Sequence, residues 1–150
     1  MEMDPAMWTK LGAVTAISIA ALGSALGTGA AGAAAVGAWK KCYAQSKAAP
    51  FLLITFVGAP LSQTIYGMIL MFSMVGQANS GGGMGVADIG VGLVEGVAIG
   101  ASAWMQGRAG AGASAAFGET GQGFTNYLTA LGVIETVAIF VLVFVMIAIG

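Results

Sequence analysis

Residues 131–145 of the chain read LGVIETVAIFVLVFV, an apolar run that contains a single carboxylate, Glu135. No charged residue follows Glu135 in the last 15 positions of the sequence. Stretches of about 20 apolar residues cross the hydrocarbon core of a bilayer as helices. This stretch therefore predicts a membrane-spanning helix with an acid near its middle.

The rest of the chain has the same character. Its 150 residues are 58% hydrophobic and 7% charged, whereas a soluble domain carries about 25% charged residues. Long uncharged segments, 11–39 and 48–87, separate the charges. We therefore predict one all-α membrane domain over 1–150, with helical spans at about 11–38, 50–76, 86–117 and 124–149.

The few charges lie mainly in the tail and the connections. Glu2 and Asp4 precede the first span, which favours a retained membrane helix over a secretory signal. The first connection, 39–49, contains three lysines, and lysine-rich loops stay in the cytoplasm. We therefore expect both termini and the Gly-rich connection 77–85 on the non-cytoplasmic side, and the short link 118–123 on the cytoplasmic side.

Two kinds of span alternate along the chain. The first and third are rich in glycine and alanine, whereas the second and fourth carry bulky side chains, which indicates a duplicated helical hairpin over about 11–76 and 86–149. Alignment of the second span with the fourth places Gln63 on Glu135, so one functional position occurs in a neutral and an ionisable form.

Small residues let helices approach closely in lipid. The candidates for such contacts are Gly23, Gly27, Gly96 and Gly100. They allow two interpretations, namely helix pairing inside one chain or the crowded inner circle of a ring with the bulky helices outside. The alternation of the two helix types favours the ring.

Composition also disfavours several function classes. The chain has no histidine and one cysteine, so neither a disulfide framework nor a His/Cys metal site can form within it. Basic clusters are nearly absent, which argues against nucleic acid as a partner. Gly27, Gly29 and Gly32 match a dinucleotide-binding pattern, but no strand precedes them, and we interpret them as helix packing.

Glu135 is the strongest functional candidate. An ionised carboxylate at the bilayer centre costs a few kcal/mol, so such an acid is expected to have a function and a partner. Glu95 and Arg108 lie nearer the ends of the third span, where long side chains can reach the interface. We expect structural roles for these two.

Polar residues in the other spans offer partners for Glu135. Pro60 removes a backbone donor in the second span, where Ser62, Gln63 and Tyr66 follow on one arc, and the third span adds Gln106. Each alone suits an ordinary interhelical hydrogen bond. A sodium ion needs several oxygen ligands and a negative charge, whereas a proton needs only the carboxylate. The set therefore predicts a Na+ site, with H+ as the alternative.

With these residues in view, the chain resembles the proteolipid K (or c) subunits of bacterial and archaeal V/A-type rotary ATPases. The similarity covers nearly the whole chain and rests on the two fused hairpins, the glycine-rich first and third helices, Pro60-x-x-Gln63-x-x-Tyr66-Gly67, Gln106-Gly107-Arg108 and Ile134-Glu135-Thr136.

The resemblance implies a role for each site residue. Glu135 matches the ion-carrying carboxylate, and Tyr66 matches a tyrosine whose hydroxyl orients it. The sodium ligands of the family correspond to the side chains of Ser62, Gln63, Gln106 and Glu135 and to the carbonyl of Ala59. Serine replaces the familiar threonine at 62 and keeps the hydroxyl. Helix geometry alone indicates that Pro60 frees the carbonyl of Phe56 instead of that of Ala59.

The resemblance also implies an assembly. It predicts a homo-oligomeric ring, surrounded by lipid in a prokaryotic cell membrane, that turns against a stator membrane subunit and contacts a central-stalk subunit on the cytoplasmic side. The chain itself is expected to have no catalytic site. Two other classes fit less well: a small multidrug exporter carries its glutamate in the first helix, and a structural tetraspan needs no buried carboxylate.

Overall fold

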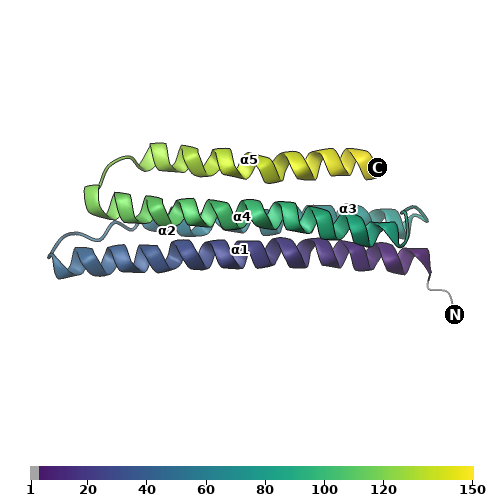
Figure 1. Cartoon of the computed structure of the whole chain (residues 1–150), viewed down its shortest axis with the longest axis horizontal. Coiled ribbons are helices and arrows are strands. Elements are labelled where there is room, and N and C mark those ends of the chain that lie inside the picture. The colour runs from purple at the N-terminus through teal and green to yellow at the C-terminus, as the bar shows by residue number, and fades with distance from the viewer. Residues whose placement is uncertain (1–3) are drawn as a thin grey trace.

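The computed structural model describes residues 4–150, so Glu2 lies outside the described part. Within these residues the chain is helical and contains no strand (Figure 1). Four stretches are long and apolar enough to cross a membrane, which confirms the prediction of an all-α membrane protein with four spans. The helices are α1 (Pro5–Ala44), α2 (Leu53–Gly58), η1 (Ala59–Leu61), α3 (Ser62–Asn79), α4 (Ala87–Thr120) and α5 (Phe124–Ile149).

The helices α1 and α4 are longer than the predicted spans. The Asp4 side chain accepts a hydrogen bond from the Ala6 backbone N–H at 3.0 Å and caps α1, which then runs for 40 residues to Ala44. The prediction that residues 39–44 belong to the first connection is therefore wrong. At 1.5 Å per residue α1 is about 60 Å long, twice the roughly 30 Å of a bilayer core, so its ends extend beyond the lipid.

The two connections at the Ala44 end, here called the lysine end, differ in length. The first comprises residues 45–52, and the Trp39 indole N–H donates to the carbonyl of Pro50 at 2.8 Å within it. The second was predicted at 118–123, but α4 continues to Thr120 and leaves only 121–123. Gly121 and Gly123 both have positive φ, which allows this tight turn.

α1 and α4 run parallel and pack against each other through glycines (Figure 1). A Cβ atom on Gly23 would overlap the backbone of Gly100, and one on Gly107 would overlap the backbone of Gly27. Gly96 similarly approaches Ala16. Within the chain these glycines therefore allow close pairing of α1 with α4, which is the first of the two interpretations given for them.

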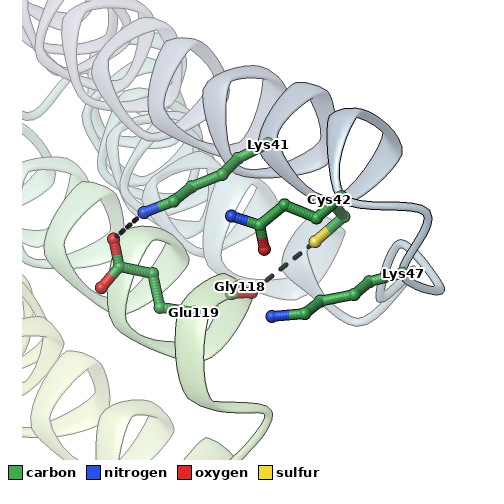
Figure 2. Close-up of a pocket in the computed structure, with 6 residues that line it drawn as sticks. Lys41, Cys42, Lys47, Gly118 and Glu119 are labelled. Atoms are coloured by element: carbon green, nitrogen blue, oxygen red, sulfur yellow. Dashed lines mark hydrogen bonds and ion pairs between the residues drawn. The ribbon is translucent and has the colours of Figure 1, made fainter.

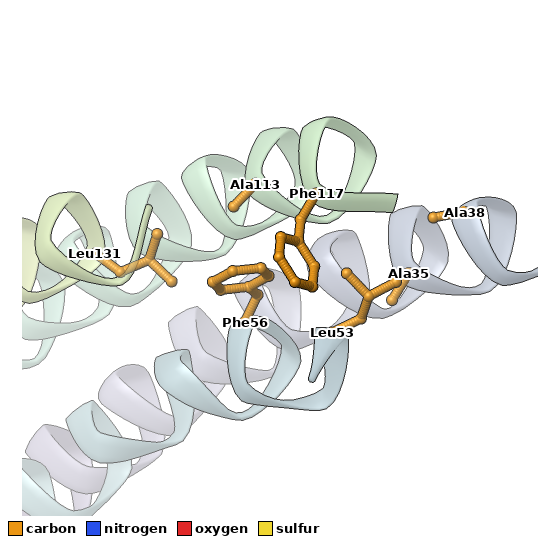
Figure 3. Close-up of a cluster of buried hydrophobic side chains, with 7 residues drawn as sticks. All are labelled: Ala35, Ala38, Leu53, Phe56, Ala113, Phe117 and Leu131. Carbon is orange, nitrogen blue, oxygen red and sulfur yellow. The ribbon is translucent and has the colours of Figure 1, made fainter. Parts of the chain in front are cut away.

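An aromatic cluster fills the space between α2, α4 and α5 toward the lysine end (Figure 3). The Phe56 and Phe117 rings meet edge to face, with centroids 6.3 Å apart and an interplanar angle of 84°. Leu131, one turn before Glu135 on α5, is 1% exposed in this cluster. The cluster therefore fixes the part of α5 that leads to the acid.

A buried carboxylate fastens the opposite end, here called the glycine end. Asp88, in the first turn of α4, is 1% exposed and accepts hydrogen bonds from the Thr9 hydroxyl at 2.6 Å and from the Met84 backbone N–H at 2.8 Å. These contacts join α1, α4 and the glycine-rich connection before α4. An acid at a helix N-terminus also suits the helix dipole.

Candidate ion-binding site

Pro60 shapes the backbone at the start of the site. It lies in η1, a single turn of 3-10 helix between α2 and α3. The carbonyl oxygen of Phe56 faces Gly110 of α4, where a Cβ would come within 2.8 Å of it. The carbonyl of Ala59 accepts instead from the backbone N–H of Ser62 and lies 3.0 Å from the Ser62 hydroxyl. Of the two candidate carbonyls, only that of Ala59 is hydrogen-bonded to a residue of the predicted set.

Glu135, near the middle of α5, is hydrogen-bonded from two other helices. The Tyr66 hydroxyl on α3 donates to its Oε1 at 2.6 Å, and the Gln106 amide on α4 donates to its Oε2 at 3.2 Å. Hydrogen bonds to a charged carboxylate are shorter and stronger than those between neutral groups. The structure thus brings together the three residues expected to hold and orient the charge.

A second group of polar atoms extends from Gln106 toward η1. The Gln63 amide donates to Gln106 Oε1 at 2.9 Å, and both glutamines are fully buried. The Ser62 hydroxyl lies 3.1 Å from Gln63 Oε1 as well as 3.0 Å from the Ala59 carbonyl. A serine hydroxyl has one hydrogen to donate. These three oxygens therefore lie close together and share one hydroxyl hydrogen. Such a group of oxygen ligands suits a hard cation.

The amide of Gln106 has a specific orientation. Its nitrogen donates both to Glu135 and to the Leu131 carbonyl, at 3.0 Å, while its oxygen accepts from Gln63. The oxygen-rich group around Ser62 and the carboxylate are thus joined through this amide. Rotation of the amide by half a turn exchanges the two atoms, so Gln106 can present either a donor or an acceptor to Glu135.

One residue of the site was missed by the sequence reasoning. The Ser102 hydroxyl on α4 donates to the carbonyl of Ile134 at 3.0 Å and so fixes the backbone beside Glu135. Ser102 lies one turn before Gln106, on the same face of α4, and this spacing was the available signal. Glu135 itself is only partly buried, and the neighbouring Val133, Thr136 and Val137 of α5 are exposed. The carboxylate is therefore accessible from the side of the bundle.

Residues 89–148, the hairpin formed by α4 and α5, match a known family. That family comprises the C subunit of ATP synthase. The match includes Gln106 and Glu135 but not the first hairpin, and no curated protein matches the chain. The likeness is thus to a family of ion-translocating rotor-ring subunits, whose members form oligomeric rings with other ATP synthase subunits.

Glu95, expected to have a structural role, does not reach this site. It faces a cleft that also contains Val145 and Ile149, at the C-terminal end of α5. One of its carboxylate oxygens is buried and has no hydrogen-bond partner within residues 4–150. Ten residues of α5 separate Val145 from Glu135, about 15 Å of helix. Glu135 is therefore the acid at the middle of the bundle.

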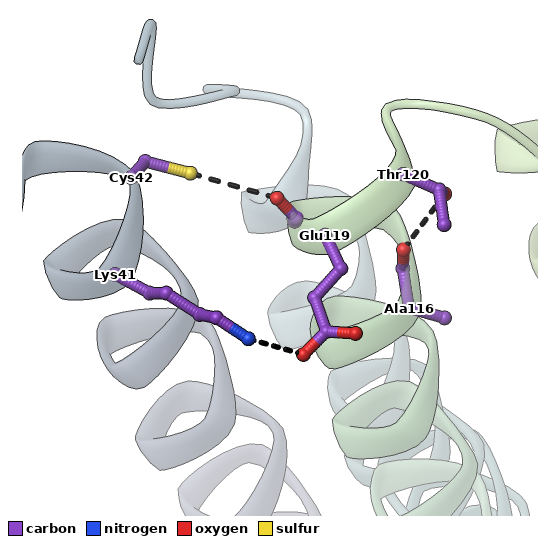
Figure 4. A network of polar contacts seen from close by, with 6 residues as sticks. Lys41, Cys42, Ala116, Glu119 and Thr120 are labelled. Carbon is purple, nitrogen blue, oxygen red and sulfur yellow. Dashed lines mark hydrogen bonds and ion pairs between the residues drawn. The ribbon is translucent and has the colours of Figure 1, made fainter. Parts of the chain in front are cut away.

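The lysine end carries an ion pair that the sequence did not indicate. Lys41 Nζ lies 2.6 Å from Glu119 Oε1, and the pair joins the ends of α1 and α4 beside Cys42 and Lys47 (Figures 2 and 4). Glu119 lies two residues beyond the predicted span, at the C-terminal end of α4. The neighbouring Lys41 ammonium lowers the pKa of the Glu119 carboxyl below its usual value. Both side chains are more than half exposed, so the pair stabilises the fold only weakly.

Proposed function

We propose that the chain is the proteolipid subunit of the rotor ring of a V/A-type rotary ATPase and that it carries Na+ on Glu135. The supporting observation is the environment of this acid. Its two oxygens accept hydrogen bonds from Tyr66 and Gln106, while its position on α5 leaves it accessible from the side. A carrier site needs both properties, because it must hold the ion during rotation and release it at the stator.

Each residue then has a distinct task. Tyr66 and Gln106 hold the carboxylate in one orientation, which reduces the rearrangement needed to bind an ion. Ser62, Gln63 and the Ala59 carbonyl supply neutral oxygens, so a bound Na+ and the carboxylate form a neutral pair that can face lipid. By resemblance, an arginine of the stator membrane subunit displaces the ion from Glu135, and half-channels in that subunit admit and release it.

Sodium, and not only a proton, is proposed because of the oxygen-rich group. A proton carrier needs no more than Glu135 and the two donors that already contact it. Besides the Ser62 backbone N–H that the Ala59 carbonyl accepts, the three oxygens of Ala59, Ser62 and Gln63 share one hydroxyl hydrogen, so lone pairs remain free among them. A cation would satisfy them. If the sodium test below fails, a proton-carrying ring is the better account.

One charge is proposed to move per chain. Gln63 occupies the position in the first hairpin that Glu135 occupies in the second, and its buried amide supports Gln106. The neutral position therefore belongs to the same site as the acid and is not a second carrier. The proposal also includes a prokaryotic cell membrane, both termini on the non-cytoplasmic side, and a central stalk at the lysine end.

Carbodiimide labelling tests the assignment, because the reagent modifies protonated carboxyl groups. The detergent-solubilised assembly is labelled near neutral pH over a range of sodium concentrations, and the modified residue is located by mass spectrometry. We expect Glu135 to be labelled slowly in sodium and faster when sodium is removed or the pH is lowered. Glu135→Gln should abolish labelling and transport while the assembly keeps its mass.

The matched control is Glu95→Gln, which removes the other membrane-embedded acid. We expect this variant to keep the sodium-sensitive labelling of Glu135. Sodium-sensitive labelling of Glu95 instead of Glu135 in the wild type would contradict the assignment of Glu135 as the ion carrier. Labelling at Glu135 that is indifferent to sodium would contradict the choice of ion alone.

A further inference from the structure

Glu95 is an acid within the spans that the ion site does not use. One of its carboxylate oxygens is buried and has no hydrogen-bond partner within residues 4–150, an arrangement that costs free energy. The side chain lines a cleft of about 310 Å³ between α4 and α5. The other residues that line the cleft are apolar, namely Gly90, Val91, Val94, Val145, Ala148 and Ile149. An occupant that suits this cleft is therefore mainly apolar and carries one hydrogen-bond donor.

The cleft lies on a side of α4 that is open within one chain. Gly96 of α4 packs on Ala16 of α1. Val94 precedes Gly96 by two residues, which is a rotation of about 200° around the helix, so it lies on the face opposite α1. Val94 is accordingly 64% exposed. Another protein can therefore approach α4 on this face, beside α5.

α1 has an exposed face of matching character. Gly27 contacts α4, and Ser18 precedes it by nine residues, about two and a half turns, so Ser18 lies on the opposite side of α1. Ser18 is exposed. Its exposed neighbours on this face are apolar, namely Met7, Leu11, Val14, Leu22 and Ala25. The face thus presents a single hydroxyl among apolar side chains, which is what the cleft requires.

Ser18 and Glu95 lie at nearly the same depth. Gly96 of α4 contacts the turn of α1 between Ala16 and Ile19. Glu95 precedes Gly96 directly, and Ser18 lies within that turn. Copies in a ring are related by rotation about the membrane normal, so residues of equal depth meet where the copies touch. A second copy can therefore bring Ser18 to the cleft without any vertical displacement.

We propose that α1 of a second copy occupies the cleft and that its Ser18 hydroxyl donates a hydrogen bond to the buried oxygen of Glu95. Each chain then offers its α1 face to one neighbour and its cleft to the other. Contacts of this head-to-tail kind close into a ring when the rotation between copies fits. A lipid acyl chain suits the cleft less well, because it fills apolar space but carries no donor. The inference rests on the proposed ring and names a contact that joins its chains.

Cysteine cross-linking of the whole detergent-solubilised assembly tests the contact. The variant carries Ser18→Cys and Glu95→Cys in a Cys42→Ala background, because Cys42 is the one native cysteine. Ser18 faces away from α4 of its own chain, so a disulfide between the two new cysteines must join different chains. Mild oxidation should give a ladder of covalent multimers on a denaturing gel. Each single-cysteine variant should remain monomeric on the same gel.

The matched control moves the cysteine along the same face of α1. Val36 is 61% exposed and follows Ser18 by 18 residues, about five full turns, so it shares the face but lies about 27 Å away along the helix. Val36→Cys with Glu95→Cys should give no ladder. An equal ladder from this control would overturn the proposal. So would the absence of a ladder from the Ser18 pair while the wild-type assembly contains several chains, and sodium-sensitive labelling of Glu135 would then still support the proposed function.

A second measurement tests the hydrogen bond itself. Ser18→Ala and Glu95→Leu are made singly and together, and the concentration of denaturing detergent that halves the assembly mass is determined. Each single change leaves one group unpaired and should lower this concentration, whereas the double variant leaves neither unpaired and should lose no more than either single variant. Glu95→Gln keeps an acceptor oxygen and should lose the least of the Glu95 variants.

Two outcomes of this second measurement would overturn the contact. Additive losses in the double variant would show that Ser18 and Glu95 act independently. Phospholipid that stays bound to the wild-type assembly and is lost from Glu95→Leu would show that a lipid occupies the cleft. Both outcomes concern the contact between copies and leave the assignment of Glu135 to its own test.

Discussion

Gly107→Ala tests the α1–α4 contact, and the chain provides its own control. A Cβ at position 107 would overlap the Cα, carbonyl carbon and oxygen of Gly27, all of them backbone atoms. Gly112 lies on the same helix, and a Cβ there would meet nothing within 4 Å. Both substitutions gain the same intrinsic helix propensity, about 1 kcal/mol. The difference between the two variants therefore isolates the collision.

The size of this difference follows from the geometry. Carbon atoms pack at about 3.5–4.0 Å, so α1 and α4 must separate by at least about 1 Å to admit the new methyl group. Neighbouring contacts along the seam then lose a quarter to a half of their attraction. Overpacking of this kind costs about 1–3 kcal/mol. We expect Gly107→Ala to unfold more easily than Gly112→Ala by that amount.

Equilibrium unfolding in mixed detergent measures both variants. The dissociated chain is titrated with a denaturing detergent in a mild one, and helix content is followed by circular dichroism, so that contacts between copies do not contribute. Agreement of the two unfolding free energies within about 0.5 kcal/mol, the usual range for substitutions that disturb no contact, would refute the proposed seam. Ring mass, measured separately, shows whether the inner-circle interpretation also holds for these glycines.

Three further predictions concern polar contacts. Tyr66→Phe removes one hydrogen bond to Glu135, worth about 1.5–3 kcal/mol, so the sodium concentration that half-protects Glu135 from carbodiimide should rise about tenfold or more, and an unchanged midpoint would contradict the orienting role. Asp88→Ala leaves two donors without their buried acceptor and should lower the unfolding free energy by about 2–4 kcal/mol, whereas a loss below about 0.5 kcal/mol would show that the cluster is dispensable. Because Lys41 lowers the pKa of Glu119, the pair stabilises the fold above the usual pKa of a glutamate and ceases to do so as the pH falls through the lowered value. Lys41→Gln should raise that pKa toward its usual value in a carboxyl NMR titration, and identical titrations would show that the pair is absent in solution.

The fold was predictable from the sequence because lipid imposes simple rules. Apolar length indicated the four spans, and the alternation of small and bulky residues indicated the two hairpins. The helix ends were not predictable in the same way, because hydropathy reports contact with lipid and not helix formation. Lys40 and Lys41 are good helix formers, and α1 continues through them to Ala44.

The candidate site was predictable in part. An acid within a membrane span needs partners, and Tyr66 and Gln106 were the polar residues at the right depth to supply them. The orientation of the Gln106 amide depends on which neighbours surround it, and the role of Ser102 depends on how α4 is rotated against α5. Spacing along one helix fixes neither property.

In the proposed rotor ring, the unequal connections at the lysine end have a consequence for how the ring would be turned. The connection 121–123 is a tight turn, whereas 45–52 is longer and exposes Phe51 at 79% of its surface. A partner protein that binds this end would contact one projecting loop per chain, residues 45–52, although each chain contributes two hairpins. The projecting loops and the Glu135 carboxylates would then both repeat at the same angle around the ring, once per chain. In the proposed mechanism, each rotation by one chain would bring one Glu135 to the stator subunit, so the number of rotational steps would equal the number of ions carried.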